Sequence, residues 1–373
     1  MAFKVFQNEK LRLARLINGL SQSELAEKID VSRQYVHSLE IDKVPSDDLV
    51  LALASLLNVK TDFFYSPLSN EVREEQCHFR QRKTTPKITT QQVIAHGTIF
   101  ELLVAYLDKS LNLPSMNFPH VDVINDEQIE EAADKCRLHW GLGFGPISNM
   151  CRVLENAGAV ITYFDGLSDK VDALSISRSR NIVIRNTFKE SIARFRFDLA
   201  HECGHLVLHQ GIETGDDATE NQANRFASAL LMPRKTFSAE FPRMSSRLDW
   251  RAIYEMKLRW KASAAAILRR AKDLQLIDEV QYYSGYRYLS KTGQRKTENY
   301  DDRIPEEHPE LLENAIKAYF EIYAQKPIDL ANEINITSSL LSKITNISFD
   351  QIPIYINELS KNVIPFPSYL KNS

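Results

Sequence analysis

The sequence lacks the features of a secreted or membrane-spanning protein. Its first residues, MAFKVFQNEK, contain neither the apolar core nor the small-residue cleavage site of a signal peptide. The most apolar run, residues 49–57 (LVLALASLL), is about half as long as a segment that crosses a bilayer. The four cysteines lie far apart and form no CxxC pair, which argues against a disulfide framework or a four-thiolate zinc site. We therefore expect a cytoplasmic protein that does not contact a membrane.

An excess of positive charge is also missing. The 46 Lys and Arg residues are balanced by 49 Asp and Glu residues, so the formal net charge is −3. This balance argues against a generally basic surface that coats nucleic acid, so any DNA contact must come from one local surface. With 373 residues, the chain is long enough for about two or three domains.

The character of the chain changes several times along its length. Residues 1–66 predict a series of short helices, whereas residues 67–95 are polar and interrupted by proline, as in a linker or an exposed docking segment. A helix is predicted over roughly 92–112, and two later runs rich in β-branched residues, AVITYF and DALSISRSRNIVIRN, predict strands. From residue 246 the pattern is mostly helical, and residues 328–344 weakly resemble a helix-turn-helix.

One segment has the residue spacing of a metal-binding helix. In RFDLAHECGHLVLHQG (196–211), His201 and His205 are four residues apart, so on a helix they point about 40° apart and lie one turn along the axis. Two imidazoles in this arrangement can bind one ion, and Glu202 can reach a water on that ion without being a ligand. The apolar residues on both sides argue against a pair of solvated surface histidines, because buried imidazoles need partners.

A catalytic zinc site needs a third protein ligand and one open position. Glu220 stands at the start of the next predicted helix, TENQANRFASALLMP, and shares a face with Asn224. Glu220 can then bind the ion while Asn224 bonds the second nitrogen of a ligand histidine. Other carboxylates lie in the preceding loop and are less rigidly placed: Glu213, Asp216 and Asp217.

Two short helices near the N-terminus have the pattern of a helix-turn-helix. Ser21 and Glu24 form a capping box at the start of SQSELAEKI. After a tight turn, Ser32 caps a second helix in which Val36 and Leu39 point inward. Two short helices joined by a turn of three or four residues are typical of DNA-binding proteins.

Long stretches around the metal motif resemble one known family. RFRFDLAHECGHLVLH followed by ENQANRFASALLMP, with HWGLGFGPISNMCRVLENAGAVITYF upstream and MKLRWKASAAAILRRAKDLQLI downstream, resembles the ImmA/IrrE family of zinc metallopeptidases. The resemblance implies that His201, His205 and Glu220 bind one zinc ion per chain and that Glu202 is the general base. In such an enzyme zinc activates a water and polarises the scissile carbonyl, and the base passes the proton of the water to the leaving amine.

Several neighbours of the motif have more than one interpretation. The strand SRNIVIRN (179–186) is expected to edge the cleft, where an extended peptide substrate pairs with it. Arg194 and Arg196 are candidates for stabilising the oxyanion, although we favour a surface or packing role for both. We also favour a structural role for His209 over metal binding, and packing over redox chemistry for Cys203.

Residues 8–66, through SQSELAEKIDVSRQYVHSLE, resemble the Cro/C1-repressor (XRE) helix-turn-helix family. In that family the second helix of the pair lies in the major groove. The residues that the resemblance places at bases are Arg33, Gln34 and Ser38, and those that it places at phosphates are Gln22 and Lys43. Arg33 suits guanine and Gln34 suits adenine, because each side chain can form two hydrogen bonds to that base.

The charge of this N-terminal segment departs from what a DNA-binding surface needs. Residues 1–68 hold eight Lys and Arg against nine Asp and Glu, so general attraction to phosphates is weak. Four acidic residues follow the second helix of the pair: Glu40, Asp42, Asp47 and Asp48. The alternative is a helix-turn-helix that contacts protein or mediates dimerisation, and we favour DNA binding by a homodimer.

We therefore predict a multidomain, mainly α protein with an α+β part. The predicted domains are a five-helix Cro/C1-type helix-turn-helix DNA-binding domain (1–68), a linker and helical connector (69–125), an ImmA/IrrE-like, gluzincin-like zinc metallopeptidase domain with a small β-sheet (126–280), and a helical C-terminal region of unknown role (281–373).

The predicted function joins the two modules. We expect a transcriptional regulator that binds double-stranded operator DNA and carries a zinc-dependent endopeptidase domain. The resemblance suggests that the substrate is a repressor or antitoxin-like protein encoded nearby. The alternative is a DNA-binding regulator whose zinc domain senses or binds a partner without peptidase turnover. The presence of Glu202 favours the enzyme, because a purely structural metal site does not need it.

Overall fold

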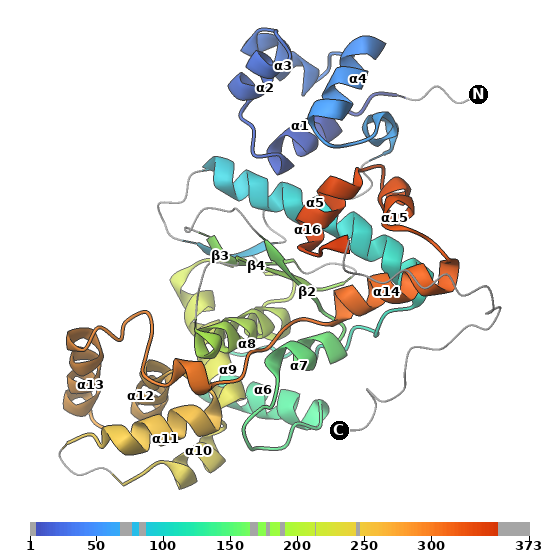
Figure 1. Cartoon of the computed structure of the whole chain (residues 1–373). Coiled ribbons are helices and arrows are strands. Elements are labelled where there is room, and N and C mark those ends of the chain that lie inside the picture. Colours follow the sequence, from blue (N-terminus) through green and yellow to red (C-terminus); the bar gives the residue numbers. More distant parts are fainter. Residues whose placement is uncertain are drawn as a thin grey trace. The chain divides into compact units, whose positions relative to one another are not determined.

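The chain forms two compact units, each built from segments that are distant in the sequence. A computed structural model describes residues 5–67, 77–81, 87–164, 171–176, 180–186, 191–212, 214–243 and 247–349 (Figure 1). The first unit comprises Met1–Leu113, Val160–Thr187 and Leu311–Ser373, and the second comprises Pro114–Ala159 and Phe188–Glu310. Within the described ranges, no helix combines the length and the apolar character needed to cross a membrane.

The first unit begins with the helix-turn-helix domain. Its helical segments are α1 (Asn8–Ile17), α2 (Gln22–Lys28), α3 (Arg33–Leu39), α4 (Asp47–Leu56) and the 3-10 turn η1 (Thr61–Tyr65). Ser21 and Glu24 form the predicted capping box, and the Ser32 hydroxyl accepts a hydrogen bond from the Tyr35 N–H at 3.1 Å. These caps confirm the two helix starts predicted from the sequence.

A four-stranded mixed sheet and the long helix α5 (Lys87–Leu111) follow in the same unit. The strands are β1 (Cys77–Gln81), β2 (Val160–Phe164), β3 (Val171–Ile176) and β4 (Ile182–Asn186), in the spatial order β1-β3-β4-β2. β3 is antiparallel to both β1 and β4, and β2 is parallel to β4. The strands β2, β3 and β4 confirm the two β-rich runs predicted from the sequence.

Two predictions about strands were wrong. β1 lies inside the polar segment that we predicted as a linker, because its pairing with β3 and not an apolar pattern makes it a strand. β4 contains most of SRNIVIRN but pairs with β3 on one side and β2 on the other. Both rows of its backbone groups are used within the sheet, so β4 offers no free edge to a peptide.

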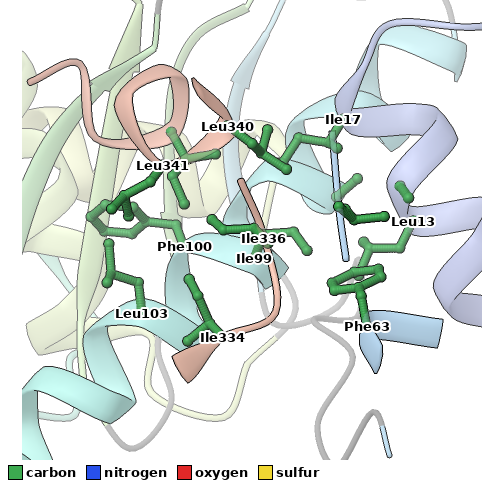
Figure 2. Packing of buried hydrophobic residues seen from close by; sticks show 14 of the residues in the cluster. Leu13, Ile17, Phe63, Ile99, Phe100, Leu103, Ile334, Ile336, Leu340 and Leu341 are labelled. Carbon is green, nitrogen blue, oxygen red and sulfur yellow. The ribbon is translucent and has the colours of Figure 1, made fainter. Parts of the chain in front are cut away.

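The C-terminal helices of the first unit are α14 (Leu311–Tyr323), α15 (Pro327–Glu333) and α16 (Ser338–Thr345). α14 contacts α5 and β2, and α16 contacts the same two elements. One hydrophobic cluster joins these helices to α5 and to the helix-turn-helix domain (Figure 2). Residues 350–373, the end of the predicted C-terminal region, lie outside the described residues.

All regular elements that the structure describes in the second unit are helices. Its elements are α6 (Asp126–His139), α7 (Met150–Asn156), α8 (Ile192–Leu208), α9 (Asp217–Leu231), α10 (Arg234–Glu240), α11 (Trp250–Trp260), α12 (Ala264–Asp273), α13 (Glu279–Lys291) and the 3-10 turn η3 (Asp301–Arg303). The two units cut across the predicted domains, because residues 126–280 contribute β2, β3 and β4 to the first unit and α6 to α12 to the second. The four domain segments therefore remain a prediction.

Buried ion pairs connect distant helices of the second unit. Arg270 on α12 donates two hydrogen bonds to the carboxylate of Glu130 on α6, at 2.6 and 2.7 Å, and a third to the Met232 carbonyl at 2.9 Å. The Arg270 side chain is fully buried and that of Glu130 is 6% exposed. Such a pair holds α6, the end of α9 and α12 together. Removing one partner leaves the other charge buried without its counter-ion, which destabilises the fold.

We expect Arg270→Met to destabilise the second unit by about 3–5 kcal/mol, because Glu130 then stays buried with only longer contacts to other cations. Removing both charges with Arg270→Met and Glu130→Leu should restore most of the loss. Urea unfolding followed by tryptophan fluorescence measures both variants, since Trp140, Trp250 and Trp260 all lie in the second unit. An unfolding midpoint of the single variant equal to that of the wild type would contradict this prediction.

Candidate metal centre and DNA-contacting helix

The metal motif lies on the buried helix α8. Ser191 caps the helix by accepting the Arg194 N–H, and apolar side chains before and after the motif are buried. His201, Glu202 and His205 are each only 1% exposed. The helix therefore places three polar side chains inside the protein, where each needs a partner that offsets the loss of water.

A glycine in the motif brings the next helix close. A Cβ atom built on Gly204 would lie 3.1 Å from the Cα and 3.2 Å from the carbonyl oxygen of Ala223 on α9. A larger residue at position 204 would push α9 away from α8. Asp216 caps α9 by accepting the N–H groups of Ala218 and Thr219, and this start of the helix directs Glu220 towards the two histidines.

Three side-chain groups converge where α8 and α9 meet. The Nε2 atoms of His201 and His205 are 3.0 Å apart, and the carboxylate oxygens of Glu220 lie 3.4 Å from His201 Nε2 and 3.3 Å from His205 Nε2. Ligand atoms about 2.0–2.1 Å from a tetrahedral zinc ion are about 3.3 Å apart. The donor set of two imidazoles and one carboxylate, and its spacing, therefore fit zinc with one coordination position open.

The ionisation of Glu220 agrees with a cation site. Burial alone would raise the pKa of the Glu220 carboxyl, but its hydrogen bonds and charge interactions with His201 and His205 outweigh burial and hold that pKa well below its usual range. The carboxyl is therefore a carboxylate at neutral pH, which is the form that binds metal ions.

The other carboxylates considered as a third ligand have different places. Asp216 uses its side chain to cap α9, Asp217 is the first residue of that helix, and Glu213 lies outside the described residues. In the part of the chain that the structure describes, His201, His205 and Glu220 are the only group of three suitable side chains close enough to hold one ion.

Two amide side chains of α9 and one further histidine surround these three groups. Asn224 Oδ1 lies 3.0 Å from Nδ1 of His201. His209 ends α8 and contacts His205, with Nδ1 of the two rings 2.9 Å apart, while its Nε2 lies 2.8 Å from Oε1 of Gln222. Burial lowers the pKa of the His209 imidazole and outweighs the opposing effect of its hydrogen bond to Gln222. Gln222 was missed in the sequence, although it is two residues from Glu220 and two from Asn224.

Three further residues singled out near the motif have defined positions in the structure. Arg196 is fully buried, pairs with the Glu307 carboxylate and donates to the Ile147 carbonyl at 2.8 Å, so its guanidinium holds α8 against two loops. Arg194 is exposed on the same helix. Cys203 is completely buried, and burial raises the pKa of its thiol well above the usual value, which disfavours the reactive thiolate.

The helix-turn-helix exposes part of the predicted DNA-contacting set. Arg33 and Gln34, at the start of α3, are both exposed. Ser38 is half-buried, and its hydroxyl donates to the Tyr35 carbonyl at 2.8 Å, so it is turned back onto its own helix. Lys43 is exposed, with its ammonium 4.1 Å from the centre of the Tyr35 ring.

Glu40 does not belong to an exposed acidic cluster. Its carboxylate is buried and accepts hydrogen bonds from Arg15 Nη2 at 3.0 Å and from Gln22 Nε2 at 2.7 Å. The Arg15 guanidinium neutralises this charge, and Gln22 is held where α2 meets α3. The exposed acidic residues after α3 are therefore Asp42, Asp47 and Asp48, whereas the net charge of residues 1–68 is unchanged, because Arg15 is one of its eight cations.

Comparisons with known proteins agree with both resemblances. Residues 154–272 match the peptidase family described as the IrrE N-terminal-like domain, and residues 11–64 match the helix-turn-helix family. No curated protein matches the sequence. The chain thus joins an N-terminal helix-turn-helix of the XRE type, which is a DNA-binding module, to a metallopeptidase-type domain, as the resemblances predicted.

Proposed function

We propose that this protein is a DNA-binding transcriptional regulator whose metallopeptidase-type domain is an active zinc endopeptidase. Its substrate is a partner protein, a repressor or antitoxin-like protein encoded nearby, and cleavage of that partner relieves repression. The protein acts in the cytoplasm as a homodimer on double-stranded operator DNA. The observation that supports the peptidase most is the convergence of His201, His205 and Glu220 beside a fourth ionisable residue, Glu202.

In this proposal each polar residue of α8 and α9 has one task. His201, His205 and Glu220 hold the zinc ion, and Asn224 orients His201 through its 3.0 Å contact. Bound there, zinc supplies Lewis-acid activation of the water and of the scissile carbonyl. Glu202 follows His201 directly and is not in the ligand group, so it takes the proton of the water and delivers it to the leaving amine.

The operator is contacted by α3. Arg33 and Gln34 contact base edges from the exposed start of the helix, and Gln22 and Lys43 contact phosphates. Ser38 faces DNA after its hydroxyl turns away from the Tyr35 carbonyl. The low net charge of the domain limits general phosphate attraction, so we expect the base contacts to contribute much of the binding free energy.

We expect Arg33→Ala and Gln34→Ala each to weaken binding to the preferred operator by about 1–3 kcal/mol and to relax its sequence preference. Fluorescence anisotropy with promoter DNA from upstream of the protein's own gene measures this effect. Arg12→Ala is the control, because Arg12 is an exposed cation on α1 and does not lie on α3. Unchanged binding by both α3 variants would favour a helix-turn-helix that contacts protein.

The peptidase is tested by incubating the purified, zinc-loaded protein with each regulator encoded beside it. We expect one partner to be cut at a single site and the cut to stop when a chelator removes the zinc. Mass spectrometry of the products identifies the bond. If the partner binds but stays intact under all conditions, the zinc domain is a sensing or partner-binding domain without turnover.

A further inference from the structure

His209 and Gln222 form a chain of contacts that ends on a proposed zinc ligand. His209 is 2% exposed and its Nδ1 lies 2.9 Å from Nδ1 of His205. Its other nitrogen, Nε2, lies 2.8 Å from Oε1 of Gln222. His209 itself is not among the residues that can share the ion, so its contact acts on the ring of His205.

The acceptor at the end of this chain fixes the protons along it. Oε1 of Gln222 only accepts hydrogen bonds, so Nε2 of His209 donates to it. The two facing Nδ1 atoms of His205 and His209 share one proton, and a His205 ring that binds an ion through Nε2 carries its proton on Nδ1, so Nδ1 of His209 offers the lone pair. His205 then donates from Nδ1 to that lone pair and keeps its own lone pair on Nε2, the atom that faces His201 and Glu220.

We propose that His209, held by Gln222, is a positioning residue that fixes His205 in the metal-binding tautomer and ring orientation. Asn224 has the corresponding contact with His201, so each of the two ligand imidazoles is oriented by a residue that does not itself bind the ion. Partners of this kind typically contribute about 10–100-fold to metal affinity. The inference rests on the proposed zinc site.

The test is a titration of zinc into the full-length protein in competition with a chelating dye. We expect His209→Phe, which keeps the ring volume but loses the acceptor, to weaken zinc binding by about 10–100-fold. His209→Asn, whose Oδ1 can accept the His205 proton, should recover most of the affinity. Gln222→Met should also weaken zinc binding, because it removes the acceptor of the His209 hydrogen bond. Gln222 is only half-buried, so this variant is a second test with less risk to the fold.

The outcomes separate a positioning role from a packing role. If His209 only fills space, the smaller Asn is the damaging change and Phe is tolerated, which would overturn the inference. A wild-type protein that binds no zinc would instead overturn the proposed function. Wild-type zinc binding with no effect of the Phe or Met substitution would overturn this inference alone.

A different observation concerns the C-terminal helix pair, residues 326–346, which has the same sequence pattern and the same helix-turn-helix arrangement as residues 21–41. The stretch SELAEKIDVSRQYVHSL begins at residue 23 and IDLANEINITSSLLSKI begins at residue 328, and the two align without a gap. Leu, Ala and Ile recur at the inward-facing positions of the first helix in both stretches. The N-terminal stretch forms α2 and α3, and the C-terminal stretch forms α15 and α16.

The backbone of the two stretches agrees in detail. Asp30 and Asn335 occupy the same turn position with φ of 52° and 58°, a left-handed conformation that Asp and Asn tolerate. The N–H of the residue after each turn position donates to the equivalent carbonyl, with both distances 3.0 Å. Ser32 and Thr337 then cap the second helix by accepting the N–H three residues on.

The two pairs differ in what the second helix faces. Leu340, which corresponds to the half-buried Tyr35, is 1% exposed and lies beside Ile17 of α1 (Figure 2). Lys343 donates to the Ile17 carbonyl at 3.0 Å. Among the α16 positions that correspond to the proposed DNA contacts of α3, Lys343 (the match of Ser38) is used in this contact, whereas Ser339 (the match of Gln34) stays exposed.

Backbone pairing strengthens the same contact. Lys60 N–H donates to the Asn335 carbonyl at 2.9 Å, and Thr337 donates to the Asn58 carbonyl from both its N–H and its hydroxyl, at 3.1 and 3.0 Å. Ile336 lies between these groups and joins the cluster that holds Phe63 and Ile99 (Figure 2). These contacts leave Arg33 and Gln34 exposed.

We infer that the C-terminal helix pair is a second helix-turn-helix whose turn and second helix bind the first one, and that it does not contact DNA. Its partner is the N-terminal helix-turn-helix domain of the same chain, contacted at α1 and at the turn after α4. The pair thereby anchors the DNA-contacting domain to α5 and the sheet, which α16 also contacts.

Hydrogen–deuterium exchange and DNA binding together test this inference. Leu340→Asp should release the pair and speed exchange of the Lys60 amide by about tenfold or more, whereas Ser339→Asp, an exposed position on the same helix, should not. Ser339→Ala should leave operator affinity unchanged, although Gln34→Ala at the matching position weakens it. Unchanged exchange of Lys60 in Leu340→Asp, or loss of operator binding in Ser339→Ala, would overturn the inference.

Discussion

Glu202→Gln should keep the zinc and lower the rate of partner cleavage by at least about 10²–10⁴-fold, the contribution that a general base typically makes. The amide has the shape of the carboxylate but cannot take a proton from water. Glu202 is 1% exposed on α8 next to His201, and it does not belong to the group that can hold the ion. Its replacement therefore removes proton transfer without removing a ligand.

Two measurements on one preparation separate the base from the ligands. Elemental analysis should give about one zinc per chain for both proteins, and the decay of intact partner in single-turnover mixtures gives the rate. Asp217→Asn is a suitable control, because it removes a nearby carboxylate that lies outside the ligand group. Equal cleavage rates for the wild type and Glu202→Gln would assign the base to another residue. Loss of zinc in the variant would make Glu202 a ligand.

Local sequence patterns predicted the elements that carry the site. The four-residue spacing of His201 and His205 needs only a regular helix, and Ser21, Glu24 and Ser32 define helix starts through contacts within three residues. Such features are visible in a sequence because the interacting residues are close along the chain. The approach of Glu220 to the histidines was predicted from its place at the start of a helix, and its contact geometry depends on Gly204, whose role the sequence did not suggest.

Contacts between distant residues could not be predicted in the same way. Arg15 neutralises Glu40 from 25 positions away, and nothing in the local pattern of either residue indicates that pairing. β1 is a strand because β3 offers it hydrogen bonds, and β4 is an inner strand because β2 pairs with its free side. Strand order depends on these tertiary contacts, which alternation of residues along one strand does not encode.

Removing any one of the three proposed ligands should abolish most zinc binding. We expect His201→Ala, His205→Ala and Glu220→Ala each to reduce zinc affinity by more than the about 10–100-fold that loss of an orienting partner costs. Two nitrogen atoms, or one nitrogen and one carboxylate, leave half of a tetrahedral site without protein ligands. Chelator competition measures the affinities, and full retention of zinc by Glu220→Ala would place the third ligand elsewhere.

Glu220→Ala is the most informative of the three, because it should lose zinc without losing the fold. The close contact of Gly204 with Ala223 and the Asp216 cap do not involve the Glu220 side chain, so α8 and α9 should stay packed. An ion that binds only the folded state raises stability by about 2.7 kcal/mol at a concentration 100 times its Kd. Added zinc should therefore raise the melting temperature of the wild type and leave that of Glu220→Ala unchanged, whereas an equal rise in both would show that the ion binds without this carboxylate.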